Sequence, residues 1–152
     1  MTGVLLLLLV TCLYAGYNLL VKQSATIAES TAASTITATI ALQAVALFCS
    51  LVFYICLRVI GGENQFALPT SAYVWAGLAG LCIGLAEIGY FYLFRGSSLT
   101  AALPVSVATP VIVGGTVVIA MVAAMFFFSE AIGPRQWLGA IVIVAGLLLV
   151  TQ

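Results

Sequence analysis

The sequence predicts an all-α integral membrane protein, an odd-span bundle of five transmembrane helices. Of the 152 residues, 64% are hydrophobic and only 5% are charged, whereas a water-soluble domain carries roughly 25% charged residues. So little polar surface cannot cover a globule in water, and the surrounding solvent must be lipid. The four basic and four acidic residues balance, which leaves no basic face. A soluble enzyme is ruled out, and a nucleic-acid partner is disfavoured.

The charged residues divide the chain into five long uncharged stretches. In chain order these contain 21, 28, 23, 34 and 17 residues. A membrane-spanning helix needs about 20 apolar residues, so each stretch can hold one span. The predicted spans are residues 3–21, 35–57, 71–94, 100–128 and 136–151. The connectors are too short to form a domain, so residues 1–152 constitute a single transmembrane domain, which we expect in a bacterial or archaeal cytoplasmic membrane.

The first two predicted spans each carry a stripe of polar residues at helical spacing. The leucine-rich start has no Lys or Arg before it, unlike a secretory signal, so we interpret it as a retained span. The first stripe consists of Thr11, Tyr14, Asn18 and Lys22. The second consists of Thr39, Gln43, Ser50 and Tyr54. Such stripes line a polar cavity or join helices by hydrogen bonds. For the amides of Asn18 and Gln43 both interpretations remain open.

Glu87 is the one acidic residue placed well inside a predicted span. An ionised carboxylate at this depth costs roughly 3 kcal/mol on insertion scales. Because burial disfavours the charged form, such a group can take up a proton on one side of the membrane and release it on the other. The alternative is a structural acid that is hydrogen-bonded or paired with Arg95. Tyr90, one turn later, fits either an aromatic cavity or an interfacial belt.

The fourth predicted span contains Pro104, Pro110 and Gly114. Proline frees backbone carbonyls, which is tolerated where protein or a cavity satisfies them again. We expect this helix to bend during function, although a static kink is equally compatible with the sequence. Thr109 belongs to a polar stripe on the same span, with Ser106 and Thr116.

The fifth predicted span carries Gly139 and Gly146, seven residues apart on one helix face. Ile143 lies between them. Small residues at such spacing let two helices approach closely, so this face is expected to pack against another helix, which can belong to another subunit.

The sequence predicts neither a metal site nor a cofactor. It contains no histidine and no CxxC pair, so the usual zinc-binding patterns are missing. We expect the four cysteines to act as small buried hydrophobic residues. They are Cys12, Cys49, Cys56 and Cys82.

The distribution of basic residues does not determine the orientation of the chain in the membrane. Five spans place the termini on opposite sides of the membrane, and the Lys/Arg tally of the two sides is two against two. An excess of Lys and Arg marks the cytoplasmic side. One hypothesis is that copies insert in both orientations and pair as an antiparallel homodimer. A single topology, fixed by the N-terminal segment or by lipid, remains the alternative.

Three segments resemble an EamA-type repeat of the drug/metabolite transporter superfamily. They are LYAGYNLLVKQSA, YFYLFRGSSLTAALPVSVATPV and FFFSEAIGPRQWLGAIVIVAGLLLV. Full-length members of that superfamily usually carry two such repeats in opposite orientation. The resemblance therefore implies a half-transporter, completed by a second copy or a paralogous partner into a ten-helix, inverted-repeat assembly.

The chain is also similar to the small multidrug resistance proteins, whose last helix dimerises through two glycines seven apart, as Gly139 and Gly146 are. Those proteins use a first-helix glutamate eight residues before a lysine. Counting back from Lys22 gives Tyr14, so that acid is missing here. Proton coupling then requires another acid, and Glu87 is the candidate.

These resemblances imply a secondary transporter of a small metabolite or amphipathic organic compound, with alternating access around a midplane site. Proton coupling through Glu87 is part of this expectation. The alternatives are a non-transporting membrane subunit that stabilises or regulates a partner, and a component of a lipid-linked sugar flippase. An enzyme is the weakest interpretation, because one glutamate is the only plausible acid or base. The expected substrate-binding residues are Tyr14, Asn18, Gln43, Tyr54, Glu87, Tyr90 and Thr109.

Overall fold

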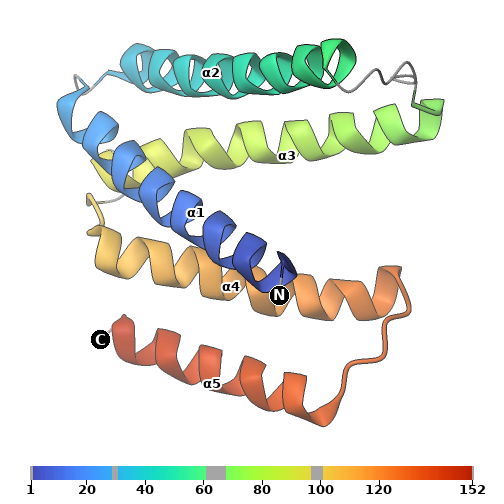
Figure 1. Cartoon of the computed structure of the whole chain (residues 1–152). Coiled ribbons are helices and arrows are strands. Elements are labelled where there is room, and N and C mark those ends of the chain that lie inside the picture. Colours follow the sequence, from blue (N-terminus) through green and yellow to red (C-terminus); the bar gives the residue numbers. More distant parts are fainter. Residues whose placement is uncertain (1, 29–30, 61–67, 97–100, 152) are drawn as a thin grey trace. The chain divides into compact units, whose positions relative to one another are not determined.

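The computed structural model describes residues 2–28, 31–60, 68–96 and 101–151. These residues form five α-helices and confirm the all-α prediction (Figure 1). The helices are α1 (Thr2–Ile27), α2 (Ala32–Val59), α3 (Thr70–Arg95), α4 (Val105–Phe127) and α5 (Pro134–Val150).

Four helices, α1 to α4, are long and apolar enough to cross a membrane. The fifth, α5, is apolar but has only 17 residues. At 1.5 Å per residue it is about 26 Å long, slightly less than the roughly 30 Å hydrocarbon core. The fifth predicted span is thus present as a helix that is shorter than the other four.

Helix α1 corrects the predicted end of the first span. The segment after residue 21 was expected to turn, but α1 continues to Ile27. Lys22 and Gln23 have good helix propensity, and no Gly or Pro follows before the helix ends. A charged residue in this chain therefore does not mark the end of a helix.

Large hydrophobic side chains cover the surface of the helices. Leu7 is 68% exposed, Trp75 72% and Leu149 74%. Water-soluble monomers rarely expose such contiguous apolar surface. This apolar surface is consistent with a membrane protein, which the composition predicted.

The helix ends follow recognisable local signals. Thr31 precedes α2, and its hydroxyl oxygen accepts a hydrogen bond from the backbone N–H of Ser34 at 3.1 Å, as an N-cap residue does. Gly96 ends α3 with a φ of 84°, which a residue without Cβ adopts at little cost. Pro104 directly precedes α4. Helix α4 therefore starts five residues later than predicted, and Pro104 lies outside it. Pro110 is the proline inside the helix.

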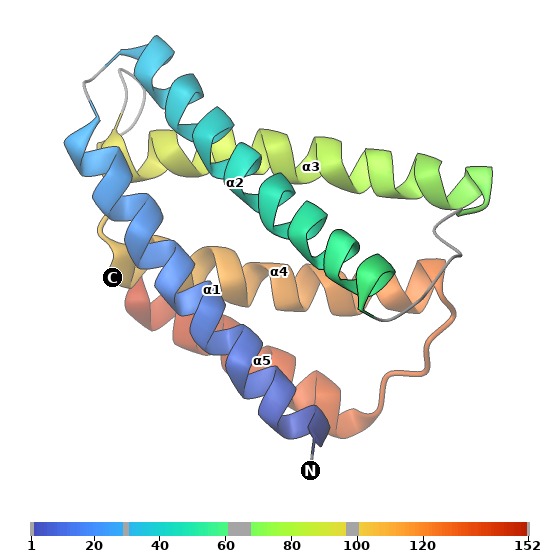
Figure 2. The ribbon, with the colours of Figure 1, turned by 45° about the horizontal axis from the view of Figure 1, so that its top comes forward.

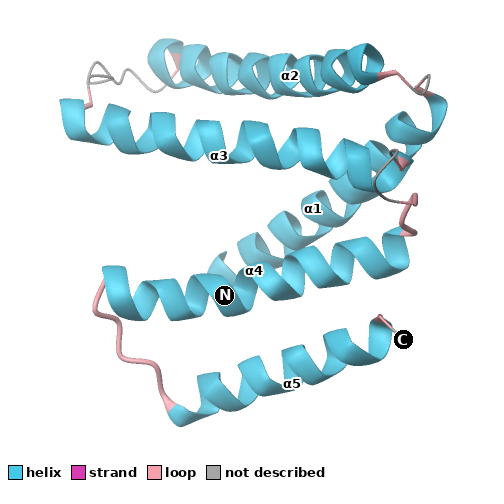
Figure 3. Ribbon diagram, turned by 180° about the vertical axis from the view of Figure 1, so that it is seen from behind, coloured by secondary structure: helices cyan, strands magenta, loops and turns pink. Residues whose placement is uncertain are grey.

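The helices form two compact units. One contains α4, α5 and α1 as far as Leu19, and the other contains the rest of α1 with α2 and α3. In the first unit α4 packs against α5 (Figure 3). A Cβ on Gly114 would lie 3.0 Å from Leu147 Cδ2 and 3.2 Å from Ile143 Cγ2. Gly114 was expected to help bend α4, and here it is the point at which α5 approaches closely.

In the second unit α2 packs against α3, and the two helices cross at an angle (Figure 2). The most buried side chains of this unit come from the end of α1, the start of α2 and the end of α3. They are Val21, Ala25, Thr35, Thr39, Glu87, Tyr90, Phe91 and Phe94.

Candidate functional site

Two cations hold the ends of three helices together in the second unit. Lys22 Nζ donates a hydrogen bond to the backbone oxygen of Phe94 at 2.7 Å and lies 5.7 Å from the centre of the Phe94 ring. The last carbonyl groups of a helix have no hydrogen-bond partner within that helix. Lys22 therefore supplies a partner for one of the terminal carbonyl groups of α3. The cation also faces the negative end of the α3 dipole.

Arg95 connects the end of α3 to the start of α2. Its Nη1 donates hydrogen bonds to Thr31 O at 2.8 Å and to Ser34 Oγ at 3.3 Å, and also to Thr35 Oγ1. All three acceptors are uncharged oxygens at the first turn of α2. The positive charge of Arg95 is thus placed at the end of the helix pair.

Glu87 lies on a buried face of α3, as the sequence predicted for an acid that must avoid lipid. Its side chain is 7% exposed, and Tyr90 and Phe94 on the same face are 8% and 1% exposed. The rings of Tyr90 and Phe94 are 4.6 Å apart between their centres. Spacings of three, four and seven residues place these side chains on one helix face. Glu87 is therefore surrounded on its own helix by aromatic side chains.

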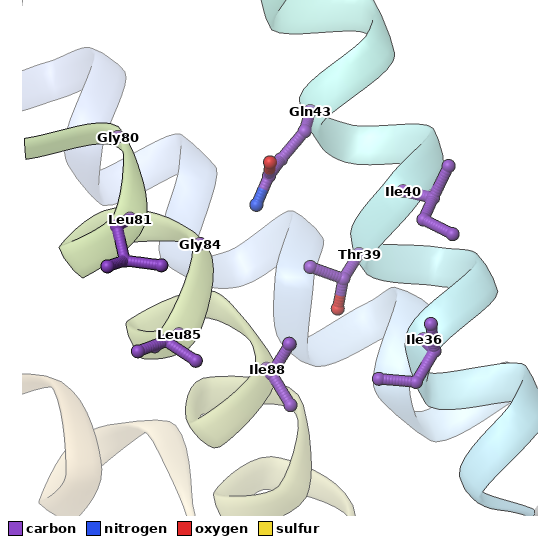
Figure 4. Close-up of a pocket in the computed structure, with 9 residues that line it drawn as sticks. All are labelled: Ile36, Thr39, Ile40, Gln43, Gly80, Leu81, Gly84, Leu85 and Ile88. Atoms are coloured by element: carbon purple, nitrogen blue, oxygen red, sulfur yellow. The ribbon is translucent and has the colours of Figure 1, made fainter. Parts of the chain in front are cut away.

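An open groove of about 310 Å³ lies between α2 and α3. Figure 4 shows its two walls, with Gln43 pointing from α2 across to Gly84 of α3. A Cβ on Gly84 would lie 3.4 Å from Gln43 Nε2, so the glycine gives the amide its space. The lining residues are Ile36, Thr39, Ile40, Gln43, Gly80, Leu81, Gly84, Leu85 and Ile88.

The predicted substrate-binding residues are distributed over both units. Gln43, Tyr54, Glu87 and Tyr90 belong to the unit of α2 and α3, and Tyr14, Asn18 and Thr109 belong to the other. Within the first group, Gln43 lines the groove, Glu87 and Tyr90 are buried, and Tyr54 is 38% exposed.

In the other unit, Asn18 is 6% exposed and Tyr14 is 64% exposed. Asn18 Nδ2 donates a hydrogen bond to Tyr14 O at 2.8 Å. The Tyr14 ring stands edge-on to that of Tyr17, with 6.3 Å between the centres. Thr109 is half-buried.

Most hydroxyl groups of the polar stripes are satisfied within their own helix. Thr11, Thr39 and Ser50 each donate to the carbonyl four residues earlier, at 2.8, 3.0 and 3.1 Å, and Thr116 donates to Ile112 O. This back-bonding is common for Ser and Thr in membrane helices. A threonine in these stripes therefore requires neither a cavity nor a second helix, and the amides and Glu87 carry more functional information.

The predicted packing face of α5 has open space at both glycines. A Cβ on Gly139 or Gly146 would meet nothing within 4 Å, whereas Ile143 reaches α4 at Gly114.

The prediction that the four cysteines are buried is wrong. All four are exposed on the surface of the chain, because each lies on a helix face that no other helix of the chain covers.

Two features of this site escaped the sequence analysis. The apolar groove residues recur at helical spacing, but lipid-facing residues show the same pattern, so the sequence offers no signal for them. The contacts of Arg95 with α2 join residues 60 to 64 positions apart, and no local pattern indicates such a pair.

The comparisons found no match for this chain among known protein families, curated proteins or solved structures.

Proposed function

We propose that this protein is a secondary transporter of a small metabolite or amphipathic organic compound, and that it works as one half of a dimeric transporter. Two protomers of opposite orientation would form an inverted repeat, with the substrate site near the membrane midplane between them. Alternating access would arise from rocking of one protomer against the other. Glu87 would carry the coupled proton.

The burial of Glu87 is the observation that carries this proposal. Ionisable residues inside membrane helices are costly, and they commonly mark substrate or proton pathways. The chain places this carboxyl group among Tyr90, Phe91 and Phe94, on a face that is almost fully covered. Lys22 and Arg95 support a fixed frame around it, because they hold the ends of α1, α2 and α3 together.

The glycine face of α5 supports a dimer. Open space beside Gly139 and Gly146 allows a helix from a second copy to approach closely. The same face would serve a non-transporting subunit that stabilises a partner, which is the second candidate function. Measurement of transport separates the two, because a packing subunit moves no solute.

Counterflow in proteoliposomes tests the proposal. Purified protein is reconstituted with each of a panel of unlabelled metabolites and quaternary cations, and uptake of the matching radiolabelled compound is followed. Saturable uptake above that of protein-free liposomes is expected for at least one compound. Uptake at the protein-free level for the whole panel would favour the packing subunit.

Glu87→Gln tests the proton coupling. When a proton gradient is imposed in either direction across the membrane, the wild type should show accumulation that changes with pH. The variant should show accumulation no greater than that of protein-free liposomes, because an amide cannot exchange a proton. Glu130→Gln, which changes an exposed acid between α4 and α5, is the matched control and should behave as wild type. Retained pH dependence in Glu87→Gln would exclude this residue as the coupling site.

A further inference from the structure

The groove between α2 and α3 has the chemistry of a site for a hydrocarbon chain. Its rim is apolar and open to the surroundings, with Ile40 62% exposed, Leu81 59% and Leu85 63%. The Thr39 hydroxyl in its wall already donates to Thr35 O at 3.0 Å. Gly80 leaves open space in the opposite wall, since a Cβ there would meet nothing within 4 Å. Between two membrane helices, such a groove faces lipid.

The groove lies at the depth of acyl chains. Helix α2 has 28 residues and is therefore about 42 Å long, compared with roughly 30 Å for the hydrocarbon core, so its ends reach the headgroup region. Ile36 lies about 8 Å along the axis from Thr31, and Gln43 lies about 18 Å from it. The groove thus starts just below the headgroups and extends toward the midplane.

A positive charge stands at the headgroup end of this groove. Arg95 binds Thr31, Ser34 and Thr35, directly before Ile36, where the groove begins. A guanidinium group has five N–H donors, and all three of these acceptors bind Nη1. The acceptors are neutral, so among the described residues they leave the charge of Arg95 available to an anion. Arginine is well suited to bind phosphate in this way.

We propose that the α2–α3 groove binds one acyl chain of an anionic phospholipid, with the lipid phosphate at Arg95. The charge at the shallow end and the apolar groove beneath it match the two parts of such a lipid. The Gln43 amide lies beside Gly84, in the half of the groove farther from Arg95. This lipid site requires neither transport nor a second protomer, so it stands independently of the proposed function.

Lipid binding to the purified, delipidated full-length protein tests the proposal by native mass spectrometry. Phosphatidylglycerol and phosphatidylcholine with identical acyl chains are added separately, and glycerol phosphate provides the headgroup without chains. We expect phosphatidylglycerol to bind more tightly than phosphatidylcholine, and glycerol phosphate not to bind. Equal binding of the two lipids would overturn the proposal. Binding of glycerol phosphate, which has no acyl chain, would also overturn it.

Gly80→Leu fills the groove and should reduce phosphatidylglycerol binding about tenfold, because displacing about two CH₂ groups of the acyl chain from apolar contact is enough for a change of that size. Gly89→Leu is the matched control. Its position is also open, with nothing within 4 Å of a Cβ, but it does not line the groove. Equal binding by the two variants would place the lipid elsewhere and refute the site.

Arg95→Gln should reduce the preference for phosphatidylglycerol over phosphatidylcholine about fivefold, whereas Arg58→Gln at the other end of α2 should leave it unchanged. Because Arg95 also joins two helices, raised ionic strength provides a second measurement on the unmodified protein, and it should lower the same preference. A preference insensitive to both changes would contradict the role of Arg95. Loss of all bound lipid whenever the protein dimerises would show that a second copy covers the groove, and would also overturn the proposal.

Discussion

Two basic side chains, Lys22 and Arg95, each donate a hydrogen bond to an uncharged backbone oxygen at a helix end, on Phe94 and Thr31. Long basic side chains near the ends of membrane helices also extend to the membrane surface. The two roles are compatible, because the same headgroup region that hydrates a cation also exposes the last carbonyls of a helix. These two hydrogen bonds connect α1 to α3 and α3 to α2 at one end of the unit.

At the residue scale, Gly96→Ala should destabilise the protein by about 1–3 kcal/mol, because its φ of 84° and ψ of 159° lie in a region that is essentially restricted to glycine. Thermal unfolding in detergent, followed by circular dichroism, measures the change. Gly89→Ala is the control, since it lies within α3 where a Cβ would meet nothing within 4 Å. That substitution should stabilise by about 0.5–1 kcal/mol. Equal effects of the two variants would show that backbone conformation at Gly96 has no consequence.

At the scale of elements, one glycine lies at a close approach in each of the two helix pairs. Gly84 gives space to Gln43 of α2, and Gly114 gives space to Ile143 and Leu147 of α5. Without a hydrophobic driving force between helices in lipid, association depends on close packing, so small residues are enriched where backbones approach. Both helix pairs, α2 with α3 and α4 with α5, have a glycine where a side chain of the other helix comes close.

Gly114→Leu should therefore disrupt the α4–α5 pair. Its Cβ alone would lie 3.0 Å from Leu147 Cδ2, and overpacking of this kind typically costs about 1–3 kcal/mol. Gly115→Leu is the matched control, because a Cβ at that position would meet nothing within 4 Å. Thermal unfolding of the two variants in detergent gives the comparison, and Leu147→Ala should partly rescue Gly114→Leu. Similar stabilities for both leucine variants would argue against this contact.

At the scale of the whole molecule, the balance of charge bears on how the chain inserts. Lys22 and Arg95 lie on one predicted side, and Arg58 and Arg135 lie on the other. Since Lys and Arg excess sets orientation, equal numbers leave both orientations accessible in our proposal. An antiparallel pair would supply the second, inverted half that a single repeat lacks.

Topology reporters fused to the C-terminus should therefore give signal on both sides of the membrane. Arg58→Gln with Arg135→Gln should move the C-terminus to the cytoplasm, and Glu130→Lys should move it to the opposite side. Transport should be low for either variant alone and recover when the two are expressed together. Signal from one side only in the wild type would rule out dual insertion and, with it, the antiparallel homodimer.

The sequence predicted the existence of all five helices, because charge spacing and apolar length are local properties. The ends of the helices were less accurate. The segment after residue 21 was assigned to a turn but continues α1 to Ile27, and α4 starts at Val105 rather than near residue 100. A single charged residue is compatible with both a helix and a loop, so charge spacing does not locate the last residue of a helix.

For the candidate site, the sequence singled out Glu87 because an exposed carboxylate in hydrocarbon is costly, and its side chain is buried. Its role in proton coupling stays a proposal. The sequence also selected Gln43, which lines the groove. It did not identify Ile36 or Ile88 as groove residues. An apolar side chain looks the same in sequence whether it faces lipid, a groove or another helix.

By itself, then, the sequence indicated the apolar character of this protein, the number of its helices and an acid that is buried. These depend on composition and on spacing along the chain. Tertiary structure alone decided that Arg95 meets α2, that Gly114 meets α5 and that a groove lies between α2 and α3. Such contacts join residues far apart in the chain, and in lipid they depend on shape complementarity between helices, which no hydropathy pattern encodes.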